Sequence, residues 1–294
     1  MSWRTVVLGG RCKLDYRMGY MVVRGLDTKR VFLNEVNTLV LESTSISLTG
    51  SLIEALTERK IKVIFCDSKH NPVSELVPHH GCHNSSEKLQ QQLKWTEEHK
   101  RLVWQLVVRE KLTKQAQHLN AVGCGEEGVQ LLQLAAETLP GDPANREGLG
   151  AQLYFRTLYG TGYSRGMDCP VNSALNYGYS MIMSAVSREI AAEGYLTQLG
   201  IKHINGFNHF NLSCDLMEPF RILVDAMVYK MAPVKFETEE KHRLWGLLAD
   251  FIEYDGERRA VTDVIALHTR ALLRAIETGE TADLTTYKFA IPKV

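Results

Sequence analysis

Residues 202–221 contain the densest group of side chains that could carry out chemistry. His203 lies in a stretch rich in glycine and asparagine, which predicts irregular backbone. Asp215 and Glu218 stand at the start of the next apolar run, so both are expected on one face of the first turn of a helix. Two carboxylates and one imidazole would suit a cation that acts on phosphates. Asp-x-x-Glu is also a capping-box pattern, and an isolated histidine is often a core residue, so both interpretations remain open.

A further candidate carboxylate, Glu147, lies near the start of a helix expected to end at residue 159. Asp142 is the expected N-cap of that helix and Pro143 its first residue, because proline is favoured at this position. Gly148 and Gly150 flank the carboxylate, and each costs about 1 kcal/mol in a helix relative to alanine. Such glycines are expected where a ligand or another backbone comes close. Alternatively, Glu147 only complements the helix dipole.

The elements that must position these residues fall into two groups. The first 78 residues predict a small β domain with one short helix, and they contain nothing that resembles a catalytic group. The helix is expected to open with the capping box Ser51–Glu54 and to reach about residue 59. Short runs of β-branched and aromatic residues predict strands at 5–8, 14–18, 20–23, 31–33, 39–46 and 61–66.

Residues 79–83 are expected to be a linker, since the composition changes between Pro72 and Asn84. Three histidines together with Cys82 in this stretch could suggest a zinc site. No second group of ligands with zinc spacing lies nearby in the sequence, so a solvated linker is the preferred interpretation.

From residue 84 onward the apolar residues recur with a helical period, which predicts a larger all-α domain, residues 84–294, that carries the metal site. The overall class is therefore α+β. Helices are expected from Asn84 as N-cap, and at 97–119, 142–159, 172–193, 215–231, 238–252 and 262–278.

One face of residues 88–114 carries a mild excess of basic side chains, which could follow a phosphate backbone. A solvated face with an ion pair between Glu97 and Arg101 is the favoured interpretation. The basic residues are Lys88, Lys94, Lys100, Arg101, Arg109, Lys111 and Lys114.

Composition narrows the class of protein further. Lysine and arginine number 34, as do aspartate and glutamate, so a nucleic acid would have to be held by local patches rather than by a global basic field. Hydrophobic residues make up 45% of the chain, which is ample for a full core. No apolar run approaches the roughly 20 residues of a membrane span. The 6 cysteines form no C-x-x-C pair, as expected of free thiols in a reducing cytoplasm.

Several short motifs, taken in order, resemble a single family. They are Asn145-Arg-Glu-Gly, Tyr154-Phe, Asn176-Tyr-Gly-Tyr, Gly200-Ile-Lys-His and Asp215-Leu-Met-Glu-Pro-Phe-Arg. Together they resemble the CRISPR-associated integrase and endonuclease, the first-numbered family of CRISPR-associated proteins. Trp3-Arg-Thr-Val-Val and Phe65-Cys-Asp resemble the form found with type II systems. The resemblance covers essentially the whole chain and implies a dimerising β domain followed by a helical catalytic domain.

The resemblance implies that Glu147, His203 and Glu218 are the catalytic metal ligands and that Asp215 is a supporting carboxylate. The implied ion is Mg²⁺ or Mn²⁺. The implied reaction joins the 3′-OH ends of captured DNA fragments to the CRISPR repeat by transesterification. Candidate DNA contacts beside the ligands, each of which could instead pair with the adjacent carboxylate, are Arg146, Lys202 and Arg221.

The resemblance also implies partners. These are double-stranded DNA, a second copy of the chain in a homodimer, and a second CRISPR-associated protein that bridges two dimers. A type II effector nuclease and an accessory subunit would assist in the selection of DNA fragments. The expected location is the prokaryotic cytoplasm, with no membrane as a partner. Two other functions could use the same residues: a metal-dependent nuclease that resolves DNA junctions, or a non-catalytic DNA-binding scaffold in which Glu147 and Glu218 are helix caps.

Overall fold

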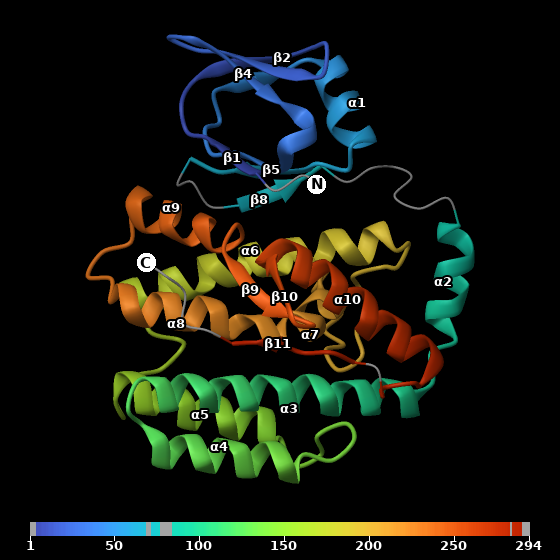
Figure 1. Cartoon of the computed structure of the whole chain (residues 1–294), viewed down its shortest axis with the longest axis vertical. Helices are drawn as coiled ribbons and strands as arrows, with labels where there is room; N and C mark the ends of the chain where they lie inside the picture. The colour runs from blue at the N-terminus through green and yellow to red at the C-terminus, as the bar shows by residue number, and fades with distance from the viewer. Residues whose placement is uncertain (1–3, 69–71, 77–83, 283, 290–294) are drawn as a thin grey trace. The chain divides into compact units, whose positions relative to one another are not determined.

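The computed structural model describes residues 4–68, 72–76, 84–282 and 284–289 of the chain. The chain divides into two compact units, residues 1–81 and 82–294 (Figure 1). The expected linker at 79–83, with its histidines and Cys82, lies outside the described residues, as does Trp3. Each unit is considered by itself below.

The N-terminal unit contains two four-stranded sheets. One has the order β1-β5-β7-β8, in which β1, β5 and β7 are parallel and β8 is antiparallel to β7. The other has the order β4-β3-β2-β6, with β6 parallel to β2 and the remaining pairs antiparallel. The bounds are β1 Arg4–Leu8, β2 Cys12–Arg17, β3 Tyr20–Arg24, β4 Thr28–Phe32, η1 Leu33–Glu35, β5 Val36–Leu41, β6 Ile46–Leu48, α1 Gly50–Glu58, β7 Lys62–Cys66 and β8 Pro72–Glu75.

Side chains from both sheets and from α1 form the core of this unit; Leu14, Leu39 and Leu52 are fully buried. Every residue of β5 is buried, as is typical of a strand that is covered on both faces. The strand predicted at 39–46 is wrong in its extent, because β5 ends at Leu41 and β6 belongs to the other sheet. Between them the backbone N–H of Ser45 donates to Ser43 Oγ over 3.2 Å, a local turn that interrupts the extended chain.

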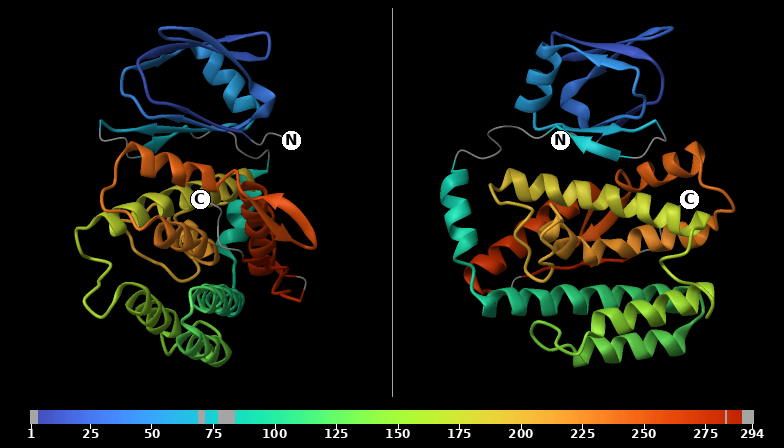
Figure 2. Two further views of the ribbon diagram at one scale, coloured as in Figure 1. Left: turned by 60° about the vertical axis from the view of Figure 1, so that its left-hand side comes forward. Right: turned by 180° about the vertical axis from the view of Figure 1, so that it is seen from behind.

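The C-terminal unit is mostly helical, and α3 is its central element. It packs on α4 and α5 at one side and on η2, α8 and α10 at the other (Figures 1 and 2). The bounds are α2 Ser85–Leu93, α3 Glu97–Ala121, α4 Gly125–Glu137, α5 Arg146–Tyr159, α6 Pro170–Ala192, α7 Asn211–Leu216, η2 Glu218–Phe220, α8 Arg221–Met231, α9 Thr238–Leu247, β9 Phe251–Tyr254, β10 Glu257–Ala260, α10 Val261–Thr278 and β11 Tyr287–Lys288.

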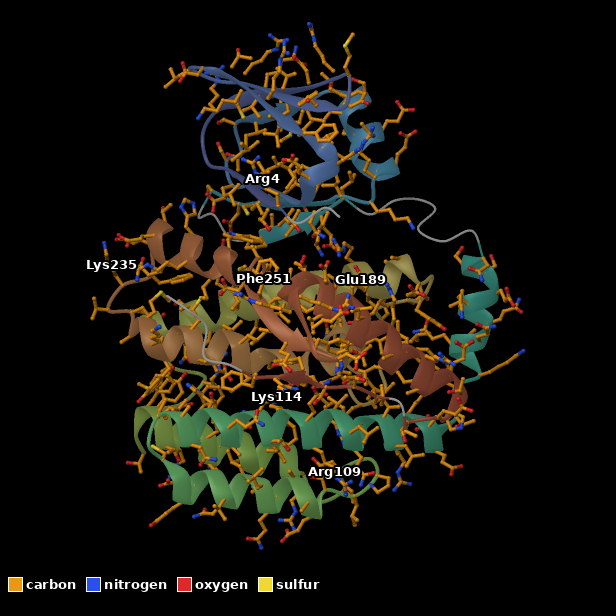
Figure 3. The ribbon with its side chains drawn as sticks, in the orientation of Figure 1. Arg4, Arg109, Lys114, Glu189, Lys235 and Phe251 are labelled. Carbon is orange, nitrogen blue, oxygen red and sulfur yellow. The ribbon has the colours of Figure 1, made fainter. Side chains whose placement is uncertain are left out.

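Because α3 is covered on two sides, the solvated basic face predicted for residues 88–114 is wrong in part. Lys111 and Lys114 are buried. Lys114 pairs with Glu110 and lies 3.8 Å from the centre of the Tyr287 ring, whereas Arg109 donates to the carbonyl of Thr138 over 2.9 Å (Figure 3). A buried lysine needs such partners, since its charge is costly to remove from water.

The all-α class predicted for the C-terminal domain is also corrected, because a three-stranded sheet with the order β10-β9-β11 lies among the helices. The helix predicted at 238–252 ends at Leu247, and the chain turns back at Asp255 and Gly256, both with positive φ. An Asp-Gly pair favours such a hairpin turn, so this was the sequence signal for the hairpin. The broader expectation, a mixed fold with a β-rich N-terminal region and a mostly helical C-terminal one, is confirmed.

The sequence predicted no membrane span and free cysteines, and both points can be examined in the residues that the structure describes. No helix among them is long and apolar enough to cross a membrane. Their cysteines, at positions 12, 66, 124, 169 and 214, carry free thiols.

Candidate functional site

Glu147 lies in the first turn of α5, which begins later than predicted. The helix starts at Arg146, and its N-cap, Asn145, has a left-handed backbone with φ 52°. Asp142 still caps it from outside: its Oδ1 accepts from the N–H of Arg146 over 2.8 Å and its Oδ2 from that of Glu147 over 3.0 Å. Pro143 therefore precedes the helix instead of opening it, because two left-handed residues, Asp142 and Asn145, turn the chain first.

Gly150 allows α5 to approach α3 closely. A Cβ at this position would lie 2.1 Å from Leu112 Cδ2 and 3.3 Å from Leu131 Cδ2, and both leucines are fully buried. The close approach predicted for this face is thus made by side chains of α3 and α4. Leu112 is next to Lys111 in α3, so the same packing brings Glu147 to the ammonium group of Lys111.

Lys111 joins the two candidate glutamates. Its Nζ contacts Glu147 Oε1 and lies 2.6 Å from Glu218 Oε2. Lys111 is only 7% exposed and Glu218 only 4%, so this is a buried ion pair with a second, partly exposed carboxylate. Burial lowers the pKa of Lys111, but the charges of Glu218 and Glu147 outweigh it and hold the pKa above its ordinary value.

Glu218 has a second cationic partner, Arg221. Its Oε1 lies 2.8 Å from Arg221 Nε, and the guanidinium lies over the ring of Tyr179, 4.5 Å from its centre. Burial raises the pKa of Glu218, yet Arg221 and Lys111 together hold it below its ordinary value. Glu218 is therefore ionised at neutral pH, as a metal ligand must be.

Asp215 holds His203 and the loop in front of it. Its Oδ2 accepts from the N–H groups of Ile201, over 2.7 Å, and Lys202, over 3.0 Å. Its Oδ1 accepts from the N–H of His203 over 3.2 Å and lies 2.5 Å from the Nδ1 of the same residue. This hydrogen bond raises the pKa of His203. Gly200 makes the arrangement possible, since a Cβ there would lie 2.7 Å from Asp215 Oδ2.

These contacts correct two sequence interpretations. Asp215 and Glu218 do not share the first turn of one helix, because α7 already begins at Asn211 and Glu218 lies in the separate turn η2. The capping-box interpretation is wrong as well, since Asp215 caps the loop at 201–203 instead of its own helix. The side chain of His203 is 48% exposed, so it is not a core histidine.

The main residue that the sequence interpretation missed is Lys111. It lies four residues beyond Val107 and eight beyond Val103, both fully buried, so it continues the buried stripe of α3. A lysine in phase with an apolar stripe was the available signal, because a buried lysine is almost always paired with a carboxylate.

The three candidate DNA contacts differ in their surroundings. Arg146 pairs with Glu137 over 2.7 Å, and Arg221 pairs with Glu218 as described above. Lys202 is exposed, and its Nζ donates to the carbonyl of Gly141 over 3.0 Å. Arg146 and Arg221 therefore have structural partners, which was the alternative that the sequence left open.

The donor set suits a divalent cation. Two carboxylates converge on one cationic group, and the imidazole of His203 is oriented by a buried carboxylate, as is common for histidine ligands. Across the described ranges, no three His, Cys, Asp or Glu side chains form a closed metal-binding group. Lys111 lies at the point where the two glutamates meet. A cavity of about 440 Å³ opens beside His203 and is lined also by Trp95, Lys100 and Asn208.

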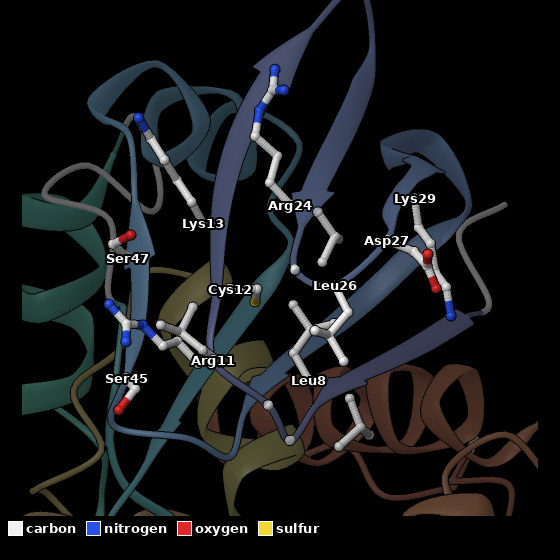
Figure 4. Close-up of a pocket in the computed structure, with 16 residues that line it drawn as sticks. Leu8, Arg11, Cys12, Lys13, Arg24, Leu26, Asp27, Lys29, Ser45 and Ser47 are labelled. Carbon is white, nitrogen blue, oxygen red and sulfur yellow. The ribbon is translucent and has the colours of Figure 1, made fainter.

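The N-terminal unit has a separate hollow of about 1220 Å³ (Figure 4). Arg11 lies on the side of Ser45 and Ser47, and Lys29 lies beside Asp27. Lys13 and Arg24 also line this hollow, so its rim carries four basic side chains.

A cluster of carboxylates and a histidine on a helical unit that follows a β unit is compatible with an enzyme that acts on phosphodiesters, and comparison with known proteins identifies the family. The profile of the family CRISPR associated protein Cas1 matches residues 6–243. The chain therefore belongs to the Cas1 family, the endonucleases and integrases of CRISPR spacer acquisition, and this expectation of the sequence is confirmed.

Individual relatives support the assignment. The CRISPR-associated endonuclease Cas1 of Neisseria meningitidis serogroup C (strain 8013) is 32% identical over 242 residues, 81% of this chain and 79% of the relative. CRISPR-associated endonuclease Cas1 1 of Pyrobaculum aerophilum is 30% identical over 241 residues, covering 75% and 79%. Among solved structures, a casposase bound to integration product has a TM-score of 0.78 at 17% identity, covering 100% of this chain and 96% of that one. A Cas1 protein from Thermotoga maritima has a TM-score of 0.74 at 15% identity, covering 94% and 97%.

Proposed function

We propose that this chain joins the 3′-OH ends of captured DNA fragments to a CRISPR repeat in a metal-dependent reaction, with Glu147, His203 and Glu218 as the metal ligands. One observation carries the proposal. Glu147 and Glu218, from helical segments far apart in the sequence, contact the same ammonium group, and His203 is held beside them by Asp215. The charges of Glu218 and His203 also affect each other's pKa, so the two side chains lie within electrostatic range.

Each residue has a defined task in this proposal. With the proton on Nδ1 donated to Asp215, His203 presents the lone pair of Nε2 as a ligand. Arg221 keeps Glu218 ionised and in place. Bound Mg²⁺ or Mn²⁺ would lower the pKa of the attacking 3′-hydroxyl and neutralise charge on the target phosphate. The 3′-oxygen then attacks phosphorus, and the 3′-oxygen of the target strand leaves.

The proposal is tested with the variants Glu147→Gln, His203→Ala and Glu218→Gln and one double variant. A labelled fragment is offered with a supercoiled plasmid that carries the repeat, with and without EDTA. Each single variant should lose nearly all joining, and the double variant little more, because the ligands act as one unit. Glu189→Gln is the matched control, since Glu189 is also buried and lies 2.6 Å from Arg188 and 3.0 Å from Arg270.

Other outcomes favour other functions. Joining retained in any single variant removes that residue from the ligand set. Cleavage of branched DNA without joining would favour the junction-resolving nuclease, in which water replaces the 3′-hydroxyl. DNA binding that is indifferent both to EDTA and to loss of the carboxylates would favour the non-catalytic scaffold.

We also propose the type II form and its partners. The relative from Neisseria meningitidis supports this form, although 32% identity defines only the family. A solved structure with a TM-score of 0.72 and 18% identity to this chain is a Cas6-RT-Cas1–Cas2 complex, which supports a Cas2 protein as a partner. We propose that a Cas2 dimer bridges two dimers of this chain. The type II effector nuclease and an accessory subunit would complete the assembly. Co-sedimentation with the Cas2 protein of a type II system, but not with that of a type I system, is the expected result.

A further inference from the structure

The two candidate glutamates are already matched by two positive charges without a metal ion. Glu147 and Glu218 carry two negative charges, and Lys111 and Arg221, which contact them, carry two positive ones. Asp215 carries a further negative charge, and its carboxylate is engaged by three backbone N–H groups and by His203. A divalent ion that joined the glutamates would therefore meet the charge of Lys111 at close range in a largely buried place.

We propose that Lys111 is a resident cation that holds Glu147 and Glu218 until DNA arrives, so that metal binding depends on DNA binding. The inference rests on the proposed ligand roles of the two glutamates. A divalent ion that displaces the ammonium group of Lys111 from the two glutamates leaves that positive charge close by, and the phosphodiester of an incoming strand compensates the excess positive charge. Lys111 thus weakens metal binding in the absence of DNA, and DNA binding strengthens it. By linkage, the bound metal ion must strengthen DNA binding by the same factor.

The test measures binding of Mn²⁺ alone, by electron paramagnetic resonance of the unbound ion, to the full-length chain with and without a short DNA duplex. DNA without protein supplies the blank. Lys111→Met removes the charge and keeps most of the side-chain volume. Lys62→Met is the matched control, because Lys62 is 6% exposed against 7% for Lys111 and pairs with Glu75 over 2.8 Å in the N-terminal unit.

For the unchanged chain we expect weak Mn²⁺ binding that DNA tightens. Lys111→Met should bind Mn²⁺ without DNA roughly ten-fold or more tightly, since one positive charge beside the ion has gone. DNA should then tighten Mn²⁺ binding far less than it does in the unchanged chain, and Lys62→Met should behave like the unchanged chain. Equal or weaker Mn²⁺ binding by Lys111→Met would overturn the inference, because Lys111 would then organise the carboxylates and not compete for them.

Glu218→Gln separates this inference from the proposed function. If Glu218→Gln leaves Mn²⁺ binding unchanged, the proposed ligand set fails and the inference with it. If Glu218→Gln abolishes Mn²⁺ binding but Lys111→Met does not tighten it, only the role of Lys111 fails. Should Lys111→Met not fold, crystals of the unchanged chain soaked in Mn²⁺ give the answer. An anomalous peak between the glutamates with Lys111 Nζ moved away supports the inference, and a peak with both contacts of Lys111 intact refutes it.

Discussion

Asp215 is a buried carboxylate that positions His203 and the loop in front of it. It is fully buried, and its four hydrogen-bond partners all belong to the short loop at 201–203. The family resemblance predicted Asp215 as a supporting carboxylate, but the sequence could not predict these partners. They depend on the return of the loop onto α7, which is a tertiary contact between residues that are distant in the chain.

Replacement of Asp215 by asparagine should therefore disturb His203 more than the fold as a whole. The amide keeps one acceptor oxygen in place of two, so at least one buried N–H loses its partner, which costs about 1–3 kcal/mol of unfolding free energy. The pKa of His203 should fall toward its ordinary value, because the hydrogen bond that His203 donates to Asp215 raises it. A titration of the His203 ring by NMR, alongside thermal melting, measures both effects. An unchanged His203 titration would show that Asp215 does not orient the ring.

Asp225, which the sequence interpretation did not single out, should make stability depend on pH. Burial raises its pKa to about 7, although Tyr179 donates a hydrogen bond to it. The unfolded chain has an aspartate pKa of about 3.9, so between these values the folded state binds the proton more tightly. The contribution of Asp225 to the free energy of unfolding should thus fall as pH rises from about 4 to about 7.

Asp225→Asn has no proton to lose, so it isolates this effect. The melting temperature of the unchanged chain should fall relative to that of Asp225→Asn as pH rises through this range, and the difference should be constant above it. Melting curves from pH 4 to pH 8 measure the difference. Parallel curves throughout would mean that Asp225 is ionised in the folded state over the whole range.

At the scale of elements, α3 determines the site because the two segments that carry the candidate glutamates meet on it. Its contacts with α5 bring Glu147, and those with η2 bring Glu218. The strand β11 supports η2, since Tyr287 donates to the carbonyl of Pro219 over 2.6 Å and stacks on Phe220. Most helices of the C-terminal unit were readable from the sequence, although α4 was not expected and α7, η2 and α8 were expected as one helix. β11 was not readable, because two residues of strand carry no periodicity and form only against β9.

Gly150→Ala should separate α5 from α3 and move Glu147 away from Lys111. The added Cβ would meet Leu112 and Leu131, and overpacking of this kind costs about 1–3 kcal/mol, more than the roughly 1 kcal/mol that alanine gains in a helix. Joining activity should fall with stability. Leu112→Ala in the same chain should restore part of the activity, because it removes the side chain that the Cβ meets.

Gly148→Ala is the control for this prediction. The atoms nearest to its Cβ would all belong to the side chain of Asn145, which can rotate away. It should therefore leave joining nearly unchanged. Equal losses in the two alanine variants would show that the close packing at Gly150 has no special role.

At the scale of the whole molecule, the sequence predicted two units and a mixed fold because the change from alternating to helical periodicity is strong and local. The small sheet of the C-terminal unit was missed for the opposite reason: its strands are short and are paired only in the folded chain. The balanced net charge was also readable from the sequence. It means that DNA would have to be bound by local basic patches and not by the charge of the whole chain. The four basic side chains around the hollow of the N-terminal unit are one such patch (Figure 4).

A chain with no net charge gains DNA affinity most readily by pooling patches from several copies, which is why we expect a homodimer, formed largely through the N-terminal unit. Sedimentation equilibrium at micromolar concentration should give about twice the chain mass of 33.2 kDa.

Arg11→Ala combined with Lys29→Ala should reduce the slope of log DNA affinity against log salt concentration, by about 0.9 for each phosphate that the variant no longer neutralises, without changing Mn²⁺ binding. Because each dimer carries both changes twice, the slope should decrease by about double the amount expected for one copy. A monomer with an unchanged salt slope in this variant would contradict both the dimer and the role of the patch.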